Sequence, residues 1–352
     1  MMLLLLLLLL LAGGCSWLGT AALRRYALSG GLLDEPNARS SHQVPTPRGG
    51  GLAIVVVFVL GCVVLQLLGQ LDAASSGVLI GAGLLVAVLG FVDDHRHVGA
   101  GWRLLGHFLA AVAVLLWLGG YGALPAQLSA VLGLPGWLVM PLGVLYLVWM
   151  LNLYNFMDGI DGIAGVEALV VCLGMALIYA MTGHGALLGA PLLLAAAVGG
   201  FLCWNFPPAR IFMGDVGSGF LGLILGMLSL QAALADLALF WAWLILLGVF
   251  VVDATWTLLR RLSRGKKPYE AHRTHAYQWA SRRHGAHRPV TLAVLAINLF
   301  WLLPIALLVG LGLLSAILGL LLAYGPLLCL ALRYHAGTDE VAMAAQSTGF
   351  RD

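Results

Sequence analysis

The chain has 352 residues, of which 61% are hydrophobic and only 9% are charged, and its formal net charge is +3. A soluble protein of this length carries about 25% charged residues, so the composition excludes a soluble globular protein and predicts an all-α, polytopic membrane protein. No polar stretch is long enough for a separate soluble domain, so residues 1–352 are predicted to form one transmembrane domain. The five cysteines are isolated and show neither paired metal-ligand spacing nor a disulfide framework.

Eleven apolar runs are each close to the length, about 20 residues, that a helix needs to cross a bilayer. They lie at 2–23, 51–69, 77–92, 104–119, 135–151, 163–181, 186–204, 218–234, 238–259, 291–310 and 312–332. The first run is interpreted as a retained transmembrane helix, because it lacks the basic start of a signal peptide. About eleven spans are therefore predicted, with ten as the alternative count.

All 18 Lys and Arg residues fall in alternate loops and in the C-terminal tail, which orients the chain. Positive loops stay in the cytoplasm, so the N-terminus is predicted outside and the C-terminus inside. The acidic and histidine side chains follow the same division, apart from Asp72, Asp236 and His184 in the short outer loops. The functional side chains are therefore expected at the cytoplasmic face.

The first cytoplasmic loop runs from Asp34 to Gly51 and ends in Pro45-Thr46-Pro47-Arg48-Gly49-Gly50-Gly51. Glycines at the start of a helix let backbone N–H groups approach an anion, and Arg39 and Arg48 could bind a phosphate through two hydrogen bonds each. The alternative is a flexible hinge with ordinary positive-inside arginines.

The second loop begins with Asp93 and Asp94, directly after a span. Such carboxylates could bind a metal–phosphate, or one could act as a base toward an acidic hydroxyl. A solvated helix cap is the alternative.

The third loop holds the motif Asn152–Gly165, in which Asn152, Asn155, Asp158 and Asp161 recur every third residue. On a helix this spacing keeps side chains roughly on one stripe. Oxygen-bearing side chains among glycines suit a hard cation and the polyphosphate that it carries. Carboxylates at the edge of a bilayer are costly and therefore indicate function.

The fourth loop runs from Asn205 to Gly219 and places Asp215 between glycines at the start of the next span. A carboxylate in this position suits Mg²⁺, although Asp is also a common N-cap residue. Phe212 could be a ligand contact or a membrane-interface anchor.

The fifth loop, 260–289, holds half of the basic residues and includes His272-Arg273-Thr274-His275. It could bind a diphosphate or an anionic lipid head group. Positive-inside bias alone explains the arginines before Gly265 but not the histidines. Asp253 is interpreted either as a snorkelling residue or as a partner of this loop.

Together these loops predict Mg²⁺-dependent phosphoryl transfer between a soluble nucleotide and a lipid phosphate. The five motifs, in this order, resemble those of the polyprenyl-phosphate N-acetylhexosamine-1-phosphate transferases, glycosyltransferase family 4. The resemblance covers nearly the whole chain. It implies transfer of a sugar-1-phosphate from a UDP-sugar to undecaprenyl phosphate, with release of UMP, at the cytoplasmic face of a bacterial inner membrane.

The resemblance also implies roles for individual residues. Asp93 and Asp94 would be catalytic, with the proton on either, and Asn155 and Asp215 would bind Mg²⁺, for which Mn²⁺ could substitute. The nucleotide site would be lined by Asp158, Asp161, Asn205 and Phe212. The phosphates and the acceptor would be held by Arg48, His272, Arg273 and His275. Direct attack by the lipid phosphate and a two-step route through an aspartyl nucleophile both stay open.

One departure concerns the histidine loop, where Ala276 replaces a third histidine that many members of the family carry. It argues against the peptidoglycan enzyme and, with the Pro45–Gly51 run, favours the branch that starts O-antigen or other surface polysaccharides. Donors in that branch are UDP-N-acetylglucosamine or 6-deoxy sugars such as N-acetylfucosamine and N-acetylquinovosamine. The chain does not choose between these donors.

Two rival functions remain as alternatives. The CDP-alcohol phosphotransferases share Asp-Gly-x-x-Ala, which Asp161–Ala164 imitates, but their motif continues with Arg where this chain has Gly165. A transporter would place charges near mid-span, reachable from both faces. The 46 glycines allow close helix packing and a homodimer. No nucleic-acid partner is expected.

Overall fold

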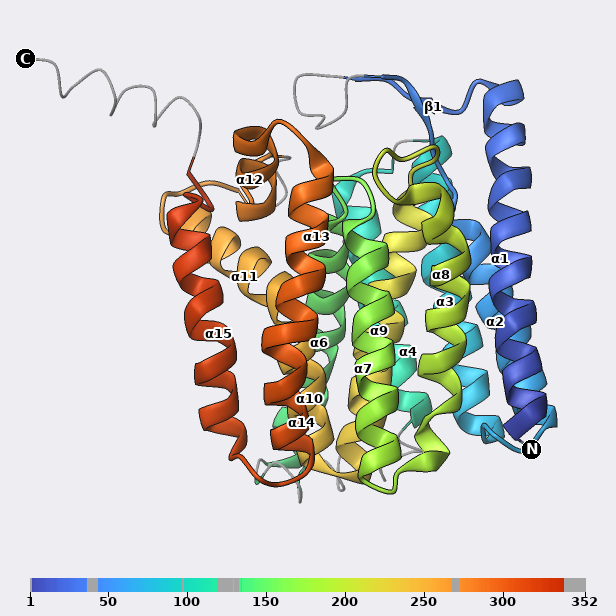
Figure 1. Ribbon diagram of the computed structural model, residues 1–352, viewed down its shortest axis with the longest axis vertical. Helices are drawn as coiled ribbons and strands as arrows, with labels where there is room; N and C mark the ends of the chain where they lie inside the picture. The colour runs from blue at the N-terminus through green and yellow to red at the C-terminus, as the bar shows by residue number, and fades with distance from the viewer. Residues whose placement is uncertain are drawn as a thin grey trace, which may run out of the picture.

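The computed structural model describes residues 2–36, 44–96, 98–118, 129, 133, 135–267 and 272–338. Within this part of the chain the protein is a bundle of helices that run roughly along one common direction (Figure 1). The first half of the bundle comprises α1 (Met2–Gly30), α2 (Gly51–Leu67), α3 (Ala73–His95), α4 (Ala100–Leu118), α6 (Gly136–Met157), α7 (Ile163–Met181) and α8 (Gly189–Asn205). The second half comprises α9 (Asp215–Ala235), α10 (Leu237–Leu246), α11 (Gly248–Leu262), α12 (Ala276–His284), α13 (His287–Ile297), α14 (Leu303–Gly310) and α15 (Ala316–Arg333).

Short elements complete the chain. A 3₁₀ turn, η2, covers Gly185–Leu187, and a π-helical turn, η3 (Asn298–Leu302), joins α13 to α14. A two-stranded antiparallel hairpin pairs β1 (Leu33–Asp34) with β2 (Thr46–Pro47) between the first two helices. The all-α prediction is therefore confirmed.

Nine helical segments in the described residues are long and apolar enough to cross a membrane, and the bent pair α10–α11 would make a tenth. Helix α2 is apolar but has only 17 residues. Each of the eleven predicted runs coincides with one of these helices or helix pairs, and 163–204 and 291–332 both divide as predicted. The number of membrane crossings itself stays a prediction.

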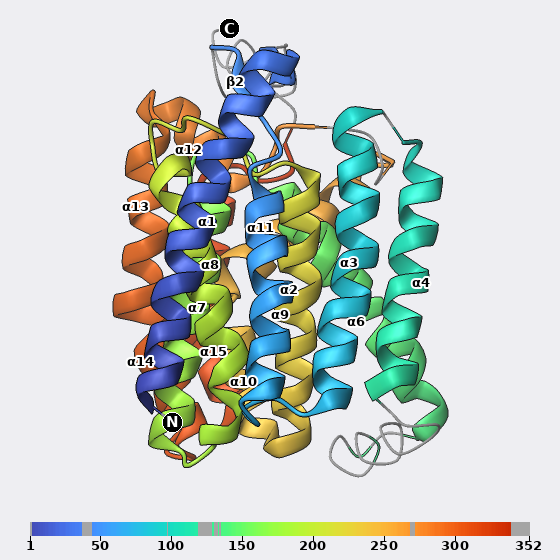
Figure 2. The same cartoon turned by 90° about the vertical axis from the view of Figure 1, so that its right-hand side faces the viewer.

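Helix α9 forms the centre of the bundle, where it packs against α2, α3, α6 and α10. All but a few of its residues are buried, and most of these are apolar or glycine. In Figure 2, α2, α3 and α4 stand side by side, and α9 is seen between α2 and α3. This packing matters for the site because the first residue of α9 is Asp215.

The predicted run 238–259 is not one straight helix. The chain bends by 72° between α10 and α11, with Leu247 at the break. Helix α11 differs in character from α10, since it carries Asp253, Arg260 and Arg261. The bend was missed because a hydropathy average over the run contains no information on the direction of the chain. After the bend, α11 tilts toward α12 and α15 (Figure 1).

The helices bring the polar loops to one end of the bundle. The β1–β2 hairpin, the N-terminal ends of α2 and α9 and the helix α12 lie together at this end, at the top of Figure 1. We call it the site end. The turns at the opposite end contain Asp72, His184 and Asp236, the three residues that were predicted to lie in the short outer loops.

The Gly49–Gly51 run serves helix packing rather than an open anion cradle. The backbone N–H of Gly50 donates to Phe212 O and that of Gly51 to Met213 O, both at 2.9 Å. A Cβ on Gly51 would lie 2.4 Å from the Cα of Gly217, so the backbones of α2 and α9 touch here. The anion-binding hypothesis for these amides is therefore wrong, because both N–H groups already have backbone partners.

Candidate active site

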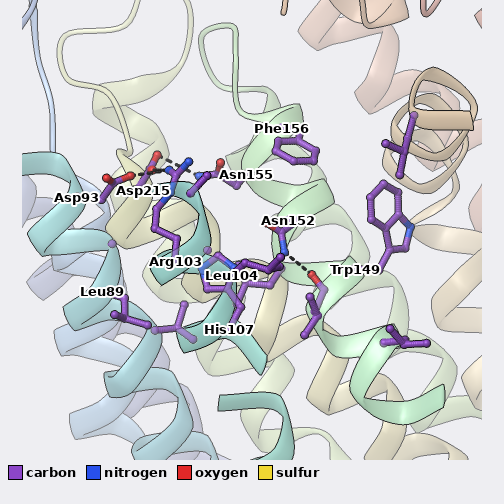
Figure 3. A pocket seen from close by; sticks show the side chains of 18 of the residues that line it. Leu89, Asp93, Arg103, Leu104, His107, Trp149, Asn152, Asn155, Phe156 and Asp215 are labelled. Atoms are coloured by element: carbon purple, nitrogen blue, oxygen red, sulfur yellow. Dashed lines mark hydrogen bonds and ion pairs between the residues drawn. The ribbon is translucent and has the colours of Figure 1, made fainter. Parts of the chain in front are cut away.

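Four side chains from four helices meet at the site end of the bundle (Figure 3). Asp215 Oδ1 accepts a hydrogen bond from Asn155 Nδ2 at 3.0 Å, and its Oδ2 is 3.1 Å from Arg103 Nη1. The same Nη1 lies 2.5 Å from Asp93 Oδ2, so Arg103 bridges the two carboxylates. Asn155 also donates to Ser218 Oγ at 2.9 Å. Two of the predicted catalytic and metal positions, Asp93 and Asp215, are thus joined by one guanidinium.

Asp94 points to a different neighbour. Its carboxylate accepts hydrogen bonds from the backbone N–H groups of Asp215 (3.1 Å) and Val216 (3.2 Å), which satisfies two amides at the start of α9. Arg48 donates to the backbone carbonyl of Asp94. Gly214 allows the approach, because a Cβ there would lie 2.6 Å from Asp94 Oδ2. The sequence offered N-capping of this helix as the alternative role of Asp215. Asp94 supplies that cap instead, so the Asp215 side chain can face Asn155 and Arg103.

The Asn-Asp motif does not form a single helical stripe. Asn152 and Asn155 lie on α6, but the helix ends at Met157, so Asp158 and Asp161 fall in the turn before α7. The predicted stripe is wrong beyond Asn155, because the backbone of Asp158 is no longer helical (φ −87°, ψ 53°) and Gly162, with a positive φ of 72°, then turns the chain into α7. Asn152 itself donates to Val148 O within its own helix.

Asp161 holds three segments together. Its Oδ2 accepts from the backbone N–H of Ala209 at 2.9 Å, and its Oδ1 is 3.0 Å from His287 Nδ1. Its backbone carbonyl accepts from the hydroxyl of Thr291 at 2.8 Å. The turn before α7, the loop after α8 and the start of α13 therefore meet at this residue.

Asn205 and Phe212 shape the loop between α8 and α9. The buried Asn205 amide accepts from Gly162 N at 3.0 Å and donates to Ile211 O at 2.9 Å, so both ends of the amide bind backbone. The backbone of Phe212 pairs with Pro47 and Gly50, which ties this loop to the β2 strand. A direct contact of Asn205 or Phe212 with a nucleotide stays a prediction.

The histidine loop is anchored by Asp253. The carboxylate of Asp253 accepts from the backbone N–H groups of Ala276 (2.9 Å) and Tyr277 (3.0 Å) and lies 3.3 Å from His275 Nδ1. The His272 ring stacks on His275, with 5.0 Å between ring centroids. Of the two sequence interpretations of Asp253, the structure supports the partner of the loop.

Three adjoining cavities open around these residues. An apolar cavity of about 530 Å³ is lined mainly by α3, α4 and α6 and ends at Asp93, Arg103, Asn155 and Asp215. A polar pocket of about 240 Å³ shares Asn155 and Asp215 with it. A basic cavity of about 870 Å³ shares Asp161, Phe212 and His287 with the polar pocket and includes the arginines Arg273, Arg282 and Arg288.

The cavities divide the residues that were predicted to bind phosphate. His272 and His275 line the apolar cavity, Arg48 lines the polar pocket and Arg273 lines the basic cavity. These four residues therefore do not form one cluster.

The polar pocket is strongly acidic. Of its described lining residues, five are aspartates (Asp34, Asp94, Asp158, Asp161 and Asp215), and Arg48 is the only Lys or Arg. Burial raises the pKa of Asp158 to about 7, and the neighbouring carboxylates add to this effect. An anionic ligand would be repelled from such a pocket unless a cation entered with it.

The residues fit a magnesium ion that is bound together with phosphate. No group of three or more His, Cys, Asp or Glu side chains in the described residues has the arrangement of a complete protein metal site. Mg²⁺ rarely needs one, because it is usually held by one or two carboxylates, substrate phosphates and water. Asp215 supplies a carboxylate at the junction of two cavities, and a half-turn of the Asn155 amide would present its oxygen.

Sequence reasoning missed two residues of this site. Neither Arg103 nor His287 was given a role from the sequence. Their partners Asp215 and Asp161 lie 112 and 126 residues away in the sequence. The only usable signal was that each lies in a predicted cytoplasmic loop, Arg103 directly before the predicted span 104–119 and His287 four residues before 291–310.

Comparison with known proteins identifies the family. Residues 76–233 match the model of glycosyl transferase family 4. A probable undecaprenyl-phosphate N-acetylglucosaminyl 1-phosphate transferase from Bacillus subtilis (strain 168) is 32% identical over 259 residues, which cover 72% of this chain and 70% of the relative. A decaprenyl-phosphate N-acetylglucosaminephosphotransferase from Mycolicibacterium smegmatis is 30% identical over 320 residues, or 79% and 76%.

A phospho-N-acetylmuramoyl-pentapeptide-transferase from Synechococcus sp. (strain RCC307) is 33% identical over 267 residues, which are 69% of each chain. Sequence identity alone therefore does not show whether this chain is more similar to the N-acetylglucosamine-phosphate transferases or to the phospho-N-acetylmuramoyl-pentapeptide-transferase. All three transfer a phospho-sugar according to their names, and two name a polyprenyl phosphate. This chain belongs to glycosyltransferase family 4, the multi-pass membrane enzymes that transfer a sugar phosphate to a polyprenyl phosphate.

Proposed function

We propose that the protein transfers an N-acetylhexosamine-1-phosphate from a UDP-sugar to undecaprenyl phosphate and releases UMP. The observation that carries this proposal is the position of Asp215 and Asn155, which line both the apolar cavity and the polar pocket. A polyprenyl chain needs an apolar surface, whereas a nucleotide diphosphate needs polar groups and a cation. The two kinds of substrate can therefore meet at these two side chains.

The apolar cavity suits the acceptor. Its walls carry Val86, Leu89, Leu104, Leu145 and Val148, and its charged groups lie together at the site end. A lipid phosphate whose chain follows these walls would stop at Arg103, which can donate to its oxygens, and beside Asp93, which can accept a proton or position the phosphate. Asp93 rather than Asp94 lines this cavity, which supports Asp93 as the residue that handles the proton.

The nucleotide-sugar donor would enter through the basic cavity and the polar pocket. Phe212 and the three arginines of the basic cavity offer an aromatic face and hydrogen-bond donors for a nucleotide sugar. Mg²⁺ at Asp215 and Asn155 would neutralise charge on the reacting phosphates. An oxygen of the lipid phosphate attacks the β-phosphorus of the donor, a P–O bond forms, and the bond to the UMP oxygen breaks. Since the acceptor and the donor would reach Asp215 from two different cavities, direct attack is favoured over an aspartyl intermediate.

The biological role proposed is the first step of a lipid-linked surface polysaccharide such as O-antigen, at the cytoplasmic face of a bacterial inner membrane. Ala276 in the histidine loop supports the surface-polysaccharide branch of the family. The loops that carry the basic residues lie at the site end, which supports a cytoplasmic position of the site. Donors to be tested are UDP-N-acetylglucosamine and the UDP forms of N-acetylfucosamine and N-acetylquinovosamine. The family match gives no support to a CDP-alcohol phosphotransferase or a transporter.

The deciding experiment uses the purified protein with undecaprenyl phosphate, Mg²⁺ and a panel of UDP-N-acetylhexosamines, with nucleotide release as the readout. Release of UMP that requires lipid phosphate and stops with a chelator is expected, and the best donor would indicate the pathway. Release of UDP would contradict the proposal, because it would mean transfer of the sugar without its phosphate.

The orientation is tested separately. Reporters fused within 120–134 should report outside and those within 265–285 inside. An inside signal from 120–134 would contradict both the number of spans and the cytoplasmic position of the site.

A further inference from the structure

The segment that follows α15 packs against the histidine loop. The chain turns at the end of this helix, where His335 and Gly337 have positive φ angles of 53° and 77°, and Ala336, Gly337 and Thr338 are then buried. We call these three residues the α15 extension. Helix α15 itself contacts α11 and α12, the helices before and after the loop (Figure 1). The extension is therefore a packed part of the site end.

Helix α11 holds the extension in place. Arg260 Nη1 donates to Ala336 O at 2.9 Å, and Arg264 Nη1 donates to Gly337 O at 3.3 Å. There is little space at Gly337, because a Cβ there would lie 3.0 Å from the Cβ of Arg260 and 3.2 Å from the backbone oxygen of Thr257. Both the positive φ and this close approach favour glycine at the position.

The extension is connected to His272 through one residue of the loop. The backbone N–H of Gly337 donates to the carbonyl oxygen of Thr274 at 2.7 Å, and the Thr274 hydroxyl lies 3.0 Å from His272 Nδ1. Thr274 is buried, and His272 lines the apolar cavity. A continuous series of contacts therefore joins the α15 extension to a side chain in the wall of that cavity.

Other parts of the loop have separate anchors. Asp253 binds the loop at His275 and at the start of α12. The backbone carbonyl of Arg273 accepts from Arg282 Nη2 at 3.1 Å, and Arg273 lines the basic cavity rather than the apolar one. Loss of the contact from the α15 extension should therefore displace His272 more than the rest of the loop.

We propose that the α15 extension positions the His272 side chain in the wall of the acceptor cavity, and that Gly337 is the positioning residue. His272 lines the same cavity as Asp93 and Arg103, so a shift of its ring changes the place where the lipid phosphate would stop. This inference rests on the proposed function, since it assumes that the apolar cavity takes the acceptor.

Gly337→Ala tests the contact in the full chain. The added methyl group meets Arg260 and Thr257, and the positive φ becomes unfavourable, so the extension should move and lose its hydrogen bond to Thr274. We expect the KM for undecaprenyl phosphate to rise about tenfold, the effect of one lost hydrogen bond. The donor KM should stay unchanged, because Arg273 keeps its own anchor.

Arg260→Ala is a second test, which adds no atoms and so decides the question if Gly337→Ala does not fold. It removes the hydrogen bond to Ala336 O and should also raise the acceptor KM. Arg260→Lys keeps a hydrogen-bond donor on the side chain, so it should restore most of the loss.

Gly312→Ala is the matched control. Gly312 has a φ of 70° in the turn between α14 and α15, at the opposite end of the bundle, and a Cβ there would meet nothing within 4 Å. The variant introduces the same backbone strain away from the histidine loop, so both KM values should stay unchanged.

A double-mutant cycle shows whether the effect passes through His272. His272→Ala should itself raise the acceptor KM, and Gly337→Ala added to it should change that KM by less than about twofold. If the two effects multiply instead, the extension does not act through His272 and the inference is wrong.

The remaining outcomes separate the inference from the proposed function. If the unmodified protein turns over but Gly337→Ala and Arg260→Ala leave the acceptor KM unchanged, or raise the donor KM equally, the inference alone is overturned. If the unmodified protein releases no UMP from any donor with lipid phosphate, the proposed function itself fails, and the inference fails with it.

Discussion

The carboxylate of Asp94 lies against the first two backbone amides of the helix that Asp215 begins, 121 residues further along the chain. Two aspartates that a sequence would place in the same category therefore have different roles. Asp94 satisfies the helix terminus, and Asp215 extends its side chain toward Asn155 and Arg103. Each role can be tested by a substitution of the aspartate concerned.

Asp215→Asn should abolish turnover without unfolding the protein. The side chain caps no helix, and asparagine has nearly the same shape, so the melting temperature should change little. Loss of the negative charge removes the main ligand offered to a cation, and we expect activity to fall at least about 100-fold. Asp236→Asn, at a helix start at the opposite end of the bundle, is the control and should retain activity. Near-normal turnover of Asp215→Asn would show that Asp215 does not bind the metal.

Asp94→Ala should lower stability as well as activity. It leaves two amides at the start of α9 without a partner, and loss of a cap costs about 1 kcal/mol, with more expected at a buried helix end. The comparison is Asp72→Ala, which removes the exposed cap of α3, a 2.8 Å hydrogen bond from Ser75 N. Both should melt earlier, but only Asp94→Ala should lose turnover. Unchanged melting of Asp94→Ala would mean that the amides find another partner.

Asp158 should make the substrate-free protein less stable as the pH rises. Burial raises its pKa from 3.8 to about 7, and the carboxylates of Asp215, Asp94 and Asp161 contribute. Between these two values the folded protein holds a proton that the unfolded chain has lost, so the free energy of unfolding falls as the pH increases. Melting temperatures measured with a chelator from pH 5 to about pH 8 should show the decline.

Asp158→Asn is the matched variant for this pH effect. Because it cannot ionise, its melting temperature should depend less on pH across the same range. Added Mg²⁺ should raise the melting temperature of the unmodified protein at the upper end of this pH range, since the cation binds the ionised carboxylates. An identical pH slope in both proteins would show that another group titrates.

Hydropathy and charge predicted most of the architecture. Each apolar run became a helix or a helix pair, because an α-helix satisfies its own backbone hydrogen bonds wherever it is buried. Antiparallel neighbours then bring alternate loops to the same end, so Asp93, Asn155 and Asp215 had to lie near one another. The bend at Leu247 was not predictable, because an average over a run carries no direction.

The individual contacts were less predictable than the arrangement. Nothing near Asp94 in the sequence shows that it caps α9, and the pairs Arg103–Asp215 and Asp161–His287 join distant segments. The sequence also does not show that both ends of the buried Asn205 amide bind the backbone of Gly162 and Ile211. Residue type and spacing identified the candidate residues that the structure brings together, but packing decided which polar groups were already satisfied.

The last prediction concerns a polar pair inside the bundle. Glu167 of α7 and Asn298 of η3 are fully buried, and Asn298 Nδ2 donates to Glu167 Oε2 at 2.7 Å. Within the described residues, Glu167 Oε1 and Asn298 Oδ1 have no hydrogen-bond partner. A proton on Glu167 would let its carboxyl donate to the amide oxygen and satisfy both atoms. The pair should therefore behave as neutral.

Glu167→Gln should keep both hydrogen bonds and change the free energy of unfolding by less than about 0.5 kcal/mol. Glu167→Leu and Asn298→Leu should each cost about 1–3 kcal/mol, because each leaves a buried polar group unsatisfied. The double variant should lose less than the sum of the two, since no polar group is left without a partner. Melting of all four proteins in the same detergent gives the comparison. If Glu167→Gln were as damaging as Glu167→Leu, the acid would have to be charged, and the neutral pair would be disproved.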